Sequence, residues 1–282
     1  MSLSLASAAA AEPSSDRRRS SRIALKAVGA RAFYPVAGLA ALLGLWWLGG
    51  AIVASNPATR AFAGFGPGPA FAALADILIS GRAWTWIWAS LYRIGVGLGW
   101  AIAIGLPLGI AIGRSAPVRQ FTHTPFQFLR MISPLAWMPI AVLAFRTWDG
   151  AIVFLIAAAA VWPVMFATAH GLRRIDPHWF TIARNLGGRG LQMLRLILLP
   201  AVMQDVLTGV RLALGVAWIV LVPAEYLGVT SGLGYAINDA RDTLEYDRLA
   251  AIVIMIGAIG LLLDGICVAL IRRYRWHDDA EA

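Results

Sequence analysis

Long runs of apolar residues recur throughout this sequence of 282 residues, and they limit its possible folds more than any other feature. A helix needs about 20 such residues to cross the hydrocarbon core of a bilayer, and within lipid the backbone must satisfy its own hydrogen bonds. We therefore predict an all-α, polytopic membrane protein with about six transmembrane helices. The expected spans cover about residues 33–54, 87–113, 125–145, 151–172, 201–228 and 249–271.

The composition agrees with this fold class. Charged residues make up only 14% of the chain, whereas a soluble domain carries about a quarter. The formal net charge of +9 could suggest nucleic acid, but the basic residues are placed as membrane orientation requires, so we expect no nucleic-acid partner. The single cysteine, Cys267, excludes an internal disulfide, and the four histidines lack metal-ligand spacing, so no metal site is expected.

Four regions follow from the hydropathy pattern. Residues 1–32 are rich in Ala and Ser and then basic, so we expect a disordered cytoplasmic tail whose basic cluster lies beside membrane lipid. Residues 33–86 hold the first transmembrane helix, a Pro/Gly-rich periplasmic loop and an interfacial segment with tryptophans. Residues 87–273 form the core domain, and residues 274–282 a second cytoplasmic tail. Prolines inside the spans suggest kinks at Pro107, Pro134, Pro139, Pro163 and Pro223.

The basic residues also set the expected orientation. With six spans and the amino terminus in the cytoplasm, most arginines outside the spans fall on the cytoplasmic side, as the positive-inside rule requires. The opposite side holds only Arg60, Arg82, Arg146, Arg241 and Arg248. We therefore expect both termini, and the segment between the fourth and fifth spans, to lie in the cytoplasm.

That cytoplasmic segment contains a short amphipathic helix over residues 176–187. Asp176 can cap its amino terminus, Pro177 fits the first helical position, and glycines from Gly187 onward end it. The helix is too short to cross a bilayer, so it could lie on the lipid surface or fit a groove in a soluble partner. Its apolar stripe consists of Trp179, Ile182, Ala183 and Leu186, with Thr181, Arg184 and Asn185 lying off that stripe.

The same segment resembles the EAA loop of ABC-importer permeases, whose pattern is EAA-x3-G-x9-I-x-L-P. Ala183, Gly187, Ile197, Leu199 and Pro200 match this spacing. The first two residues of the pattern differ, since Thr181 replaces the glutamate and Ile182 replaces the first alanine. The contact that the glutamate carboxylate would make with the ATPase is therefore in doubt. In that family the loop is a coupling helix that docks on the ATP-binding subunit. The resemblance assigns coupling to Asp176, Pro177, Trp179, Thr181, Ile182, Ala183, Arg184, Asn185 and Gly187.

Three further segments narrow the resemblance to the nitrate, sulfonate, taurine and bicarbonate branch. They are MISPLAWMPIAVLAF at 131–145, VWPVMFATAHGLRRI at 161–175 and GVRLALGVAWIVLVPAEYLGVTSGLGYAI at 209–237. The form of the first segment resembles nitrate permeases most closely. The resemblance implies a type I ABC-importer transmembrane domain in the bacterial inner membrane. It also implies a second copy of the chain, two ABC ATPases and a periplasmic substrate-binding protein.

The chain itself is not expected to be an enzyme. It has no GxxxxGK[ST] loop, so ATP and magnesium would be bound by the partner ATPases and no cofactor by this chain. Ionisable residues within spans usually face protein or water. The candidates for an anion path are Arg130, Pro134, Trp137, Arg211 and Glu225.

Each of these path residues also has a structural explanation. Arg130 could reach the cytoplasmic interface, and Arg211 could pair with Asp205 or with a lipid phosphate. Pro134 and Trp137 could serve the packing of a kinked helix, and Glu225 could fix a helix or gate by hydrogen bonds. Arg93 and Asp264 are expected to be packing or interfacial charges. Two other classes of function remain open: a stand-alone secondary transporter or channel, and a membrane-embedded enzyme. Neither the paired carboxylates of the first nor a catalytic motif of the second occurs in the sequence.

Overall fold

The computed structural model describes residues 14–176, 178, 185 and 199–273. The chain divides into two compact units, with the boundary between residues 67 and 68. In the first unit, α1 (Ser14–Ser55) is followed by a short 3-10 helix, η1 (Arg60–Phe65). The indole N–H of Trp46 donates to the carbonyl of Phe65 at 2.8 Å and ties η1 to α1. The start of α1 lies within the tail that we expected to be disordered. This part of α1 is rich in arginine and alanine, which favour helix, and the chain is helical from Ser14.

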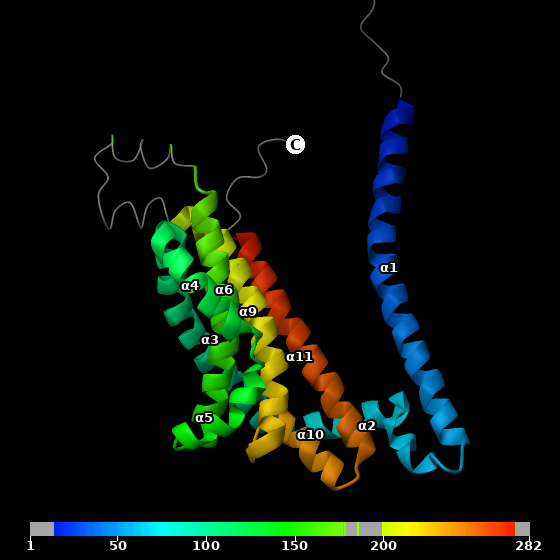
Figure 1. The fold of residues 1–282 in the computed structure, drawn as a ribbon. Helices are drawn as coiled ribbons and strands as arrows, with labels where there is room; N and C mark the ends of the chain where they lie inside the picture. The colour runs from blue at the N-terminus through cyan, green and yellow to red at the C-terminus, as the bar shows by residue number, and fades with distance from the viewer. Residues whose placement is uncertain (1–13, 177, 179–184, 186–198, 274–282) are drawn as a thin grey trace, which may run out of the picture. The chain divides into compact units, whose positions relative to one another are not determined.

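The second unit is built on four long helices, shown in Figure 1: α3 (Arg82–Arg114), α6 (Trp148–Arg174), α9 (Leu199–Gly228) and α11 (Tyr246–Arg273). Each extends a predicted span by a few residues. Shorter helices α2 (Pro67–Ile79) and α10 (Leu233–Asp242) lie at one end of the unit. Among the described residues there are five helices long and apolar enough to cross a membrane, or six with one bent pair. The prediction of an all-α, polytopic membrane fold is confirmed.

Glycines allow α3 and α6 to pack closely. A side chain at Gly109 would lie 2.6 Å from the carbonyl oxygen of Met165, and one at Gly105 would lie 3.1 Å from Val164. The contacts advance along both helices in the same direction, so α3 and α6 run parallel. Close approach of this kind is a common way to associate helices within lipid, where burial from water gives no driving force.

The third predicted span, 125–145, is wrong in its start and in its continuity. Helix α4 (Ala116–Met131) begins after Ser115, whose side chain accepts a hydrogen bond from the N–H of Val118. It is followed by a 3-10 turn, η2 (Pro134–Trp137), and by α5 (Met138–Ala144). The two halves meet at 86°. The polar residues of α4 made it look like a loop, and Pro134, which lacks a backbone N–H, stands at the break.

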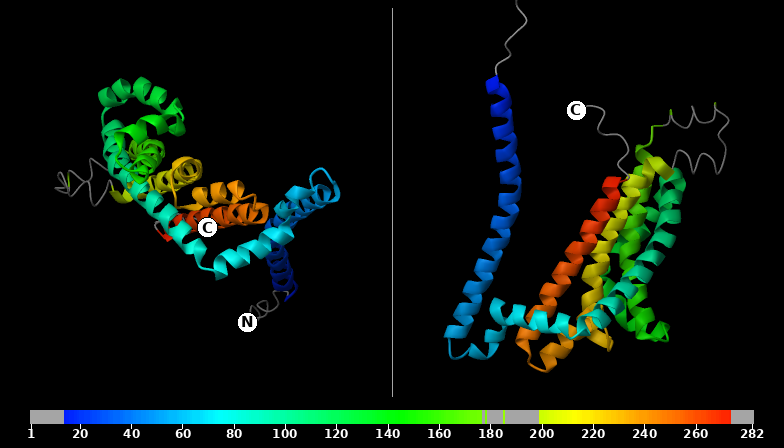
Figure 2. Two further views of the ribbon diagram at one scale, coloured as in Figure 1. Left: turned by 90° about the horizontal axis from the view of Figure 1, so that it is seen from below. Right: turned by 180° about the vertical axis from the view of Figure 1, so that it is seen from behind.

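The two ends of the second unit differ in charge. The end at which α3, α6 and α11 finish can be followed in Figures 1 and 2. The helices carry a cluster of arginines there, and we call this the basic end. At the opposite end α3, α6 and α11 begin, α9 finishes and α10 lies, and we call this the α10 end. The basic end holds Arg114, Arg119, Arg173, Arg174, Arg272 and Arg273.

Candidate functional site

A buried ion pair joins α3 to α9 near the α10 end. Arg93 is 3% exposed and Glu225 is fully buried, and Nη1 of Arg93 lies 2.5 Å from Oε1 of Glu225. Buried charges are costly unless they are paired and fully hydrogen-bonded. The surroundings provide these bonds, so the pair is a fixed part of the structure.

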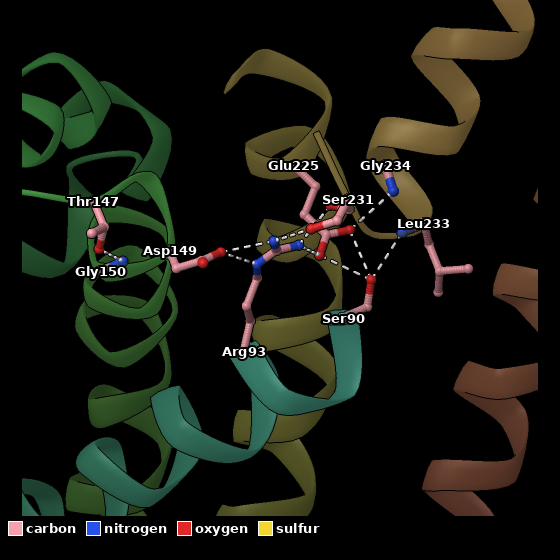
Figure 3. A network of polar contacts seen from close by, with 9 residues as sticks. All are labelled: Ser90, Arg93, Thr147, Asp149, Gly150, Glu225, Ser231, Leu233 and Gly234. Carbon is pink, nitrogen blue, oxygen red and sulfur yellow. Dashed lines mark hydrogen bonds and ion pairs between the residues drawn. The ribbon is translucent and has the colours of Figure 1, made fainter. Parts of the chain in front are cut away.

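The same two side chains hold the turn between α9 and α10, as Figure 3 shows. Arg93 donates to the carbonyl and to the hydroxyl of Ser231, both at 2.8 Å. Glu225 accepts from the N–H of Gly234 at 3.0 Å. The hydroxyl of Ser90 lies 2.8 Å from Oε2 of Glu225 and accepts from the N–H of Leu233. Ser90 and Glu225 thus each accept a hydrogen bond from an N–H group at the start of α10, where no helical partner exists.

A second carboxylate reaches Arg93 from the start of α6. Asp149 accepts from Nε of Arg93 at 2.8 Å, and its side chain is 58% exposed. Thr147 caps this helix by accepting from the N–H of Gly150. Arg93 therefore links α3, α6, α9 and the turn into α10, and we name Ser90, Arg93, Asp149, Glu225 and Ser231 the Arg93 network.

Two glycines leave room for the Arg93 network. Gly232 has a φ of 111°, which L side chains rarely adopt. A Cβ at Gly234 would lie 2.7 Å from Cβ of Glu225. The turn therefore requires glycine at both positions.

A separate cavity of about 380 Å³ lies between the broken span, α6 and α9. Among the described residues that line it, Arg130 is the one that carries a charge, and the remaining walls are apolar or aromatic. Pro134 and Trp137 of the break also line it, so three of the predicted path residues come together here. The lining consists of Leu129, Arg130, Ile132, Pro134, Trp137, Phe154, Ala158, Ala159, Trp162, Pro163 and Val216.

The depth of Arg130 follows from the corrected start of α4. It lies fourteen residues beyond Ala116, which is about 21 Å along a helix. Arg130 therefore lies in the last turn of α4, next to the break in this span. Within the described part of the chain no carboxylate pairs with Arg130, whose guanidinium lies 5.4 Å from the ring centre of Phe166. Its charge is therefore available to an anion.

The other two predicted path residues lie elsewhere. Glu225 belongs to the Arg93 network and not to the cavity lining. Arg211 forms a two-point ion pair with Asp264 of α11, at 2.6 and 2.8 Å. The suggested pairing of Arg211 with Asp205 is wrong, because six residues along a helix place two side chains on different faces. Asp205 lies 3.9 Å from Arg174 instead.

Polar side chains also gather at the α10 end, between α10 and α11. Arg248 donates to Glu245 at 2.8 Å, and its guanidinium lies 5.3 Å from the ring centre of Trp86. This hydrogen bond lowers the pKa of the Glu245 carboxyl below its ordinary value. The cluster fixes the start of α11 beside α3.

Most of the predicted coupling residues, including Gly187, lie outside the described residues. Of that set the structure describes Asp176 and Asn185, and both are exposed. The carboxylate of Asp176 accepts from the N–H of His178 at 2.9 Å, as a helix cap does. The others are Pro177, Trp179, Thr181, Ile182, Ala183 and Arg184.

The sequence did not assign a site role to Ser90, Arg93, Asp149 or Ser231. One signal was available, since an arginine and a glutamate each lie inside a span and buried charges need partners. Arg93 and Glu225 are 132 residues apart in the sequence, however, so only the fold identifies them as partners. Among residues 14–176, 178, 185 and 199–273 no group of His, Cys, Asp and Glu could hold a metal ion.

Comparison with known proteins places the chain among transport proteins. The family model described as "Binding-protein-dependent transport system inner membrane component" matches residues 105–276. A bicarbonate transport system permease protein of Synechococcus elongatus is 38% identical over 178 residues, which are 62% of this chain and 64% of that protein. A nitrate import permease protein of Leptolyngbya laminosa is 37% identical over 178 residues, or 63% of this chain and 64% of that protein. The chain thus spans just under two thirds of the length of these two relatives.

A third permease and a solved structure are also similar to this chain. A putative aliphatic sulfonates transport permease protein of Bacillus subtilis is 32% identical over 207 residues, covering 73% of this chain and 75% of that protein. Among solved structures, the inward-facing MetNI methionine ABC transporter has a TM-score of 0.58 at 16% identity. That match covers 67% of this chain and 94% of the transporter chain, and it identifies the fold.

Proposed function

Because the chain belongs to the inner membrane components of binding-protein-dependent transport systems, we propose that it is the permease subunit of an ATP-driven importer of a small anion. Its relatives are permeases for bicarbonate, nitrate and aliphatic sulfonates. ATP would be hydrolysed by two partner ATPases, and a periplasmic binding protein would deliver the substrate. Two copies of the chain would form the path, and neither copy would change the substrate chemically.

The orientation in this proposal follows from the two ends of the second unit. The basic end would lie in the cytoplasm, in keeping with the positive-inside rule, and the proposal places both termini on that side of the membrane. The segment 176–187 leaves α6 at this end, after Arg174, and would meet the ATPases there. The α10 end would face the periplasm and the binding protein.

The observation that carries the anion path is the cavity with the unpaired Arg130. The guanidinium of Arg130 is exposed beside apolar and aromatic walls, and it can donate charge-assisted hydrogen bonds to an anion. The single charge also limits the strength of binding, which suits a site that must release what it binds. Nitrate is the proposed substrate, from the resemblance of residues 131–145. Bicarbonate, cyanate, taurine and aliphatic sulfonates are the alternatives.

Replacing Arg130 with glutamine tests this site. The assay is ATP-dependent uptake by proteoliposomes that contain the permease, its ATPases and the binding protein, after a thermal-shift screen of that binding protein against nitrate, nitrite, bicarbonate, cyanate and taurine. We expect uptake to fall about 10- to 150-fold, the equivalent of about 1.5–3 kcal/mol for a hydrogen bond to a charged group. Arg130→Lys should retain more uptake than Arg130→Gln.

The control is Arg146→Gln, which removes an exposed arginine outside the cavity. It should transport as the unmodified protein does. Full uptake by Arg130→Gln would show that the path lies elsewhere, whereas a lack of ATP-dependent uptake by the unmodified assembly would contradict the importer itself.

A further inference from the structure

Helix α4 has one polar side and one apolar side. Its polar residues follow one another at four, four and three positions and therefore share one side of the helix: Arg119, His123, Gln127 and Arg130. The other side carries the exposed residues Val118, Phe121, Pro125 and Phe128. The apolar side suits contact with lipid, whereas a polar side within a membrane normally faces protein or water. We name the four polar residues the α4 polar row.

The α4 polar row extends from the basic end to the cavity. Helix α4 begins at the basic end, directly after α3 finishes there, as Figure 1 shows. Arg119 is the fourth residue of α4, and Arg130 lines the cavity. The two lie about 16 Å apart along the helix, and neighbours within the row are about 5–6 Å apart. An anion that leaves Arg130 would therefore meet a further polar side chain at each turn of α4.

The side chains of the row supply hydrogen-bond donors without any negative charge. Helix α4 contains no aspartate or glutamate. Arg119 and Thr122 donate to backbone carbonyls, and within the described part of the chain His123 and Gln127 have no side-chain partner. An imidazole and an amide each carry N–H donors, and arginine donates charge-assisted bonds. The row therefore suits an anion and offers a cation no carboxylate.

Helix α6 carries a further donor beside the α4 polar row. Phe126 of α4 contacts Trp162 of α6, with ring centres 5.5 Å apart, and holds the two helices together. The guanidinium of Arg130 lies 5.4 Å from the ring centre of Phe166. His170 is exposed and lies one helical turn after Phe166, on the same side of α6 and closer to the basic end. Donors from both helices thus lie between the cavity and the basic end.

We propose that the α4 polar row, together with His170, forms the cytoplasmic half of the anion path. The anion passes from Arg130 to Gln127 and His123 and leaves beside Arg119 at the basic end. Several weak sites in sequence allow movement, because no single site binds strongly enough to trap the anion. This inference rests on the proposed function, which supplies the cavity and the direction of transport.

Opposite charges placed at His123 test this route. His123→Glu and His123→Lys are compared by ATP-dependent uptake per assembled complex in proteoliposomes. The probe is whichever of nitrate, nitrite, bicarbonate, cyanate and taurine stabilises the binding protein in the thermal-shift screen. We expect at least about fivefold more uptake by His123→Lys than by His123→Glu, because a carboxylate beside the path repels the anion and an ammonium attracts it.

The control for the sign of the charge is Arg272, an exposed arginine at the basic end of α11. Uptake by Arg272→Glu and Arg272→Lys should differ by less than about twofold, because a charge away from the path is screened by salt. Equal uptake by His123→Glu and His123→Lys, whether full or reduced, would overturn the inference. A difference no larger than that at Arg272 would also overturn it.

A second pair of variants tests the donors themselves. His123→Leu/Gln127→Leu should lower uptake at least about fivefold, since it removes two hydrogen-bond donors from the route. Phe121→Leu/Phe128→Leu alters the apolar side of α4 at similar depths and should transport as the unmodified protein does. Equal losses from the two double variants would contradict the route. If Arg130→Gln still lowers uptake in that case, the proposed function stands and only the cytoplasmic route is wrong.

Discussion

Replacing Arg93 with leucine is expected to lower the free energy of unfolding by about 3–5 kcal/mol, because it leaves Glu225 charged and buried without its partner. The loss should also release the turn into α10, since Ser231 is held by the same guanidinium. Unfolding in mixed detergent micelles, followed by the fluorescence of the tryptophans, measures the change.

Two further variants distinguish the cost of breaking the buried Arg93–Glu225 pair from the cost of removing any arginine. Arg241→Leu removes an arginine whose pair with Asp242 is exposed, so it should cost less than about 1 kcal/mol. The double variant Arg93→Leu/Glu225→Leu removes both buried charges and should recover part of the loss. A cost for Arg93→Leu as small as that for Arg241→Leu would show that the Arg93 network does not stabilise the fold.

Replacing Gly187 with leucine is expected to abolish ATP turnover by the assembled transporter. The sequence places Gly187 where the amphipathic helix ends and the chain turns back toward the membrane, and it matches the glycine of the EAA pattern. A branched side chain at that turn would both strain the backbone and disturb the seating of the helix on an ATPase. Release of phosphate by membranes that contain the complete transporter is the measurement.

The matched control is Gly190→Leu, a glycine three residues further on at a position where the EAA pattern specifies no residue. It should leave most of the ATP turnover intact. Full turnover by Gly187→Leu, in complexes that still contain the ATPases, would count against a coupling role for residues 176–187.

Hydropathy alone was sufficient to predict the long helices. Four of the predicted spans agree with α3, α6, α9 and α11 to within a few residues, because a span of lipid must be matched by a run of apolar side chains. The break around Pro134 was harder. The first half of that segment, α4, carries Arg119, Gln120 and His123, so average hydropathy could not distinguish an amphipathic helix from a loop.

The pairing of charges could not be predicted in the same way. Glu225 pairs with Arg93, which is 132 residues away in the sequence, and Arg211 pairs with Asp264, which is 53 residues away. Both pairs depend on which helices are neighbours and on how each helix is rotated, and neither property is encoded in local periodicity. The sequence did identify Arg130, Pro134 and Trp137 as path candidates, and the fold brings these three to one cavity.

Crosslinking from Asn185 to an ATPase is the most direct test of the central claim, that movement produced by ATP hydrolysis enters this chain through residues 176–187. Asn185 is exposed, and in a Cys267→Ala background the variant Asn185→Cys carries one thiol. We predict that a short crosslinker joins it to an ATPase subunit in the complete transporter, and that Thr230→Cys, exposed at the α10 end, gives no such product. Crosslinking from Thr230 and none from Asn185 would contradict the account.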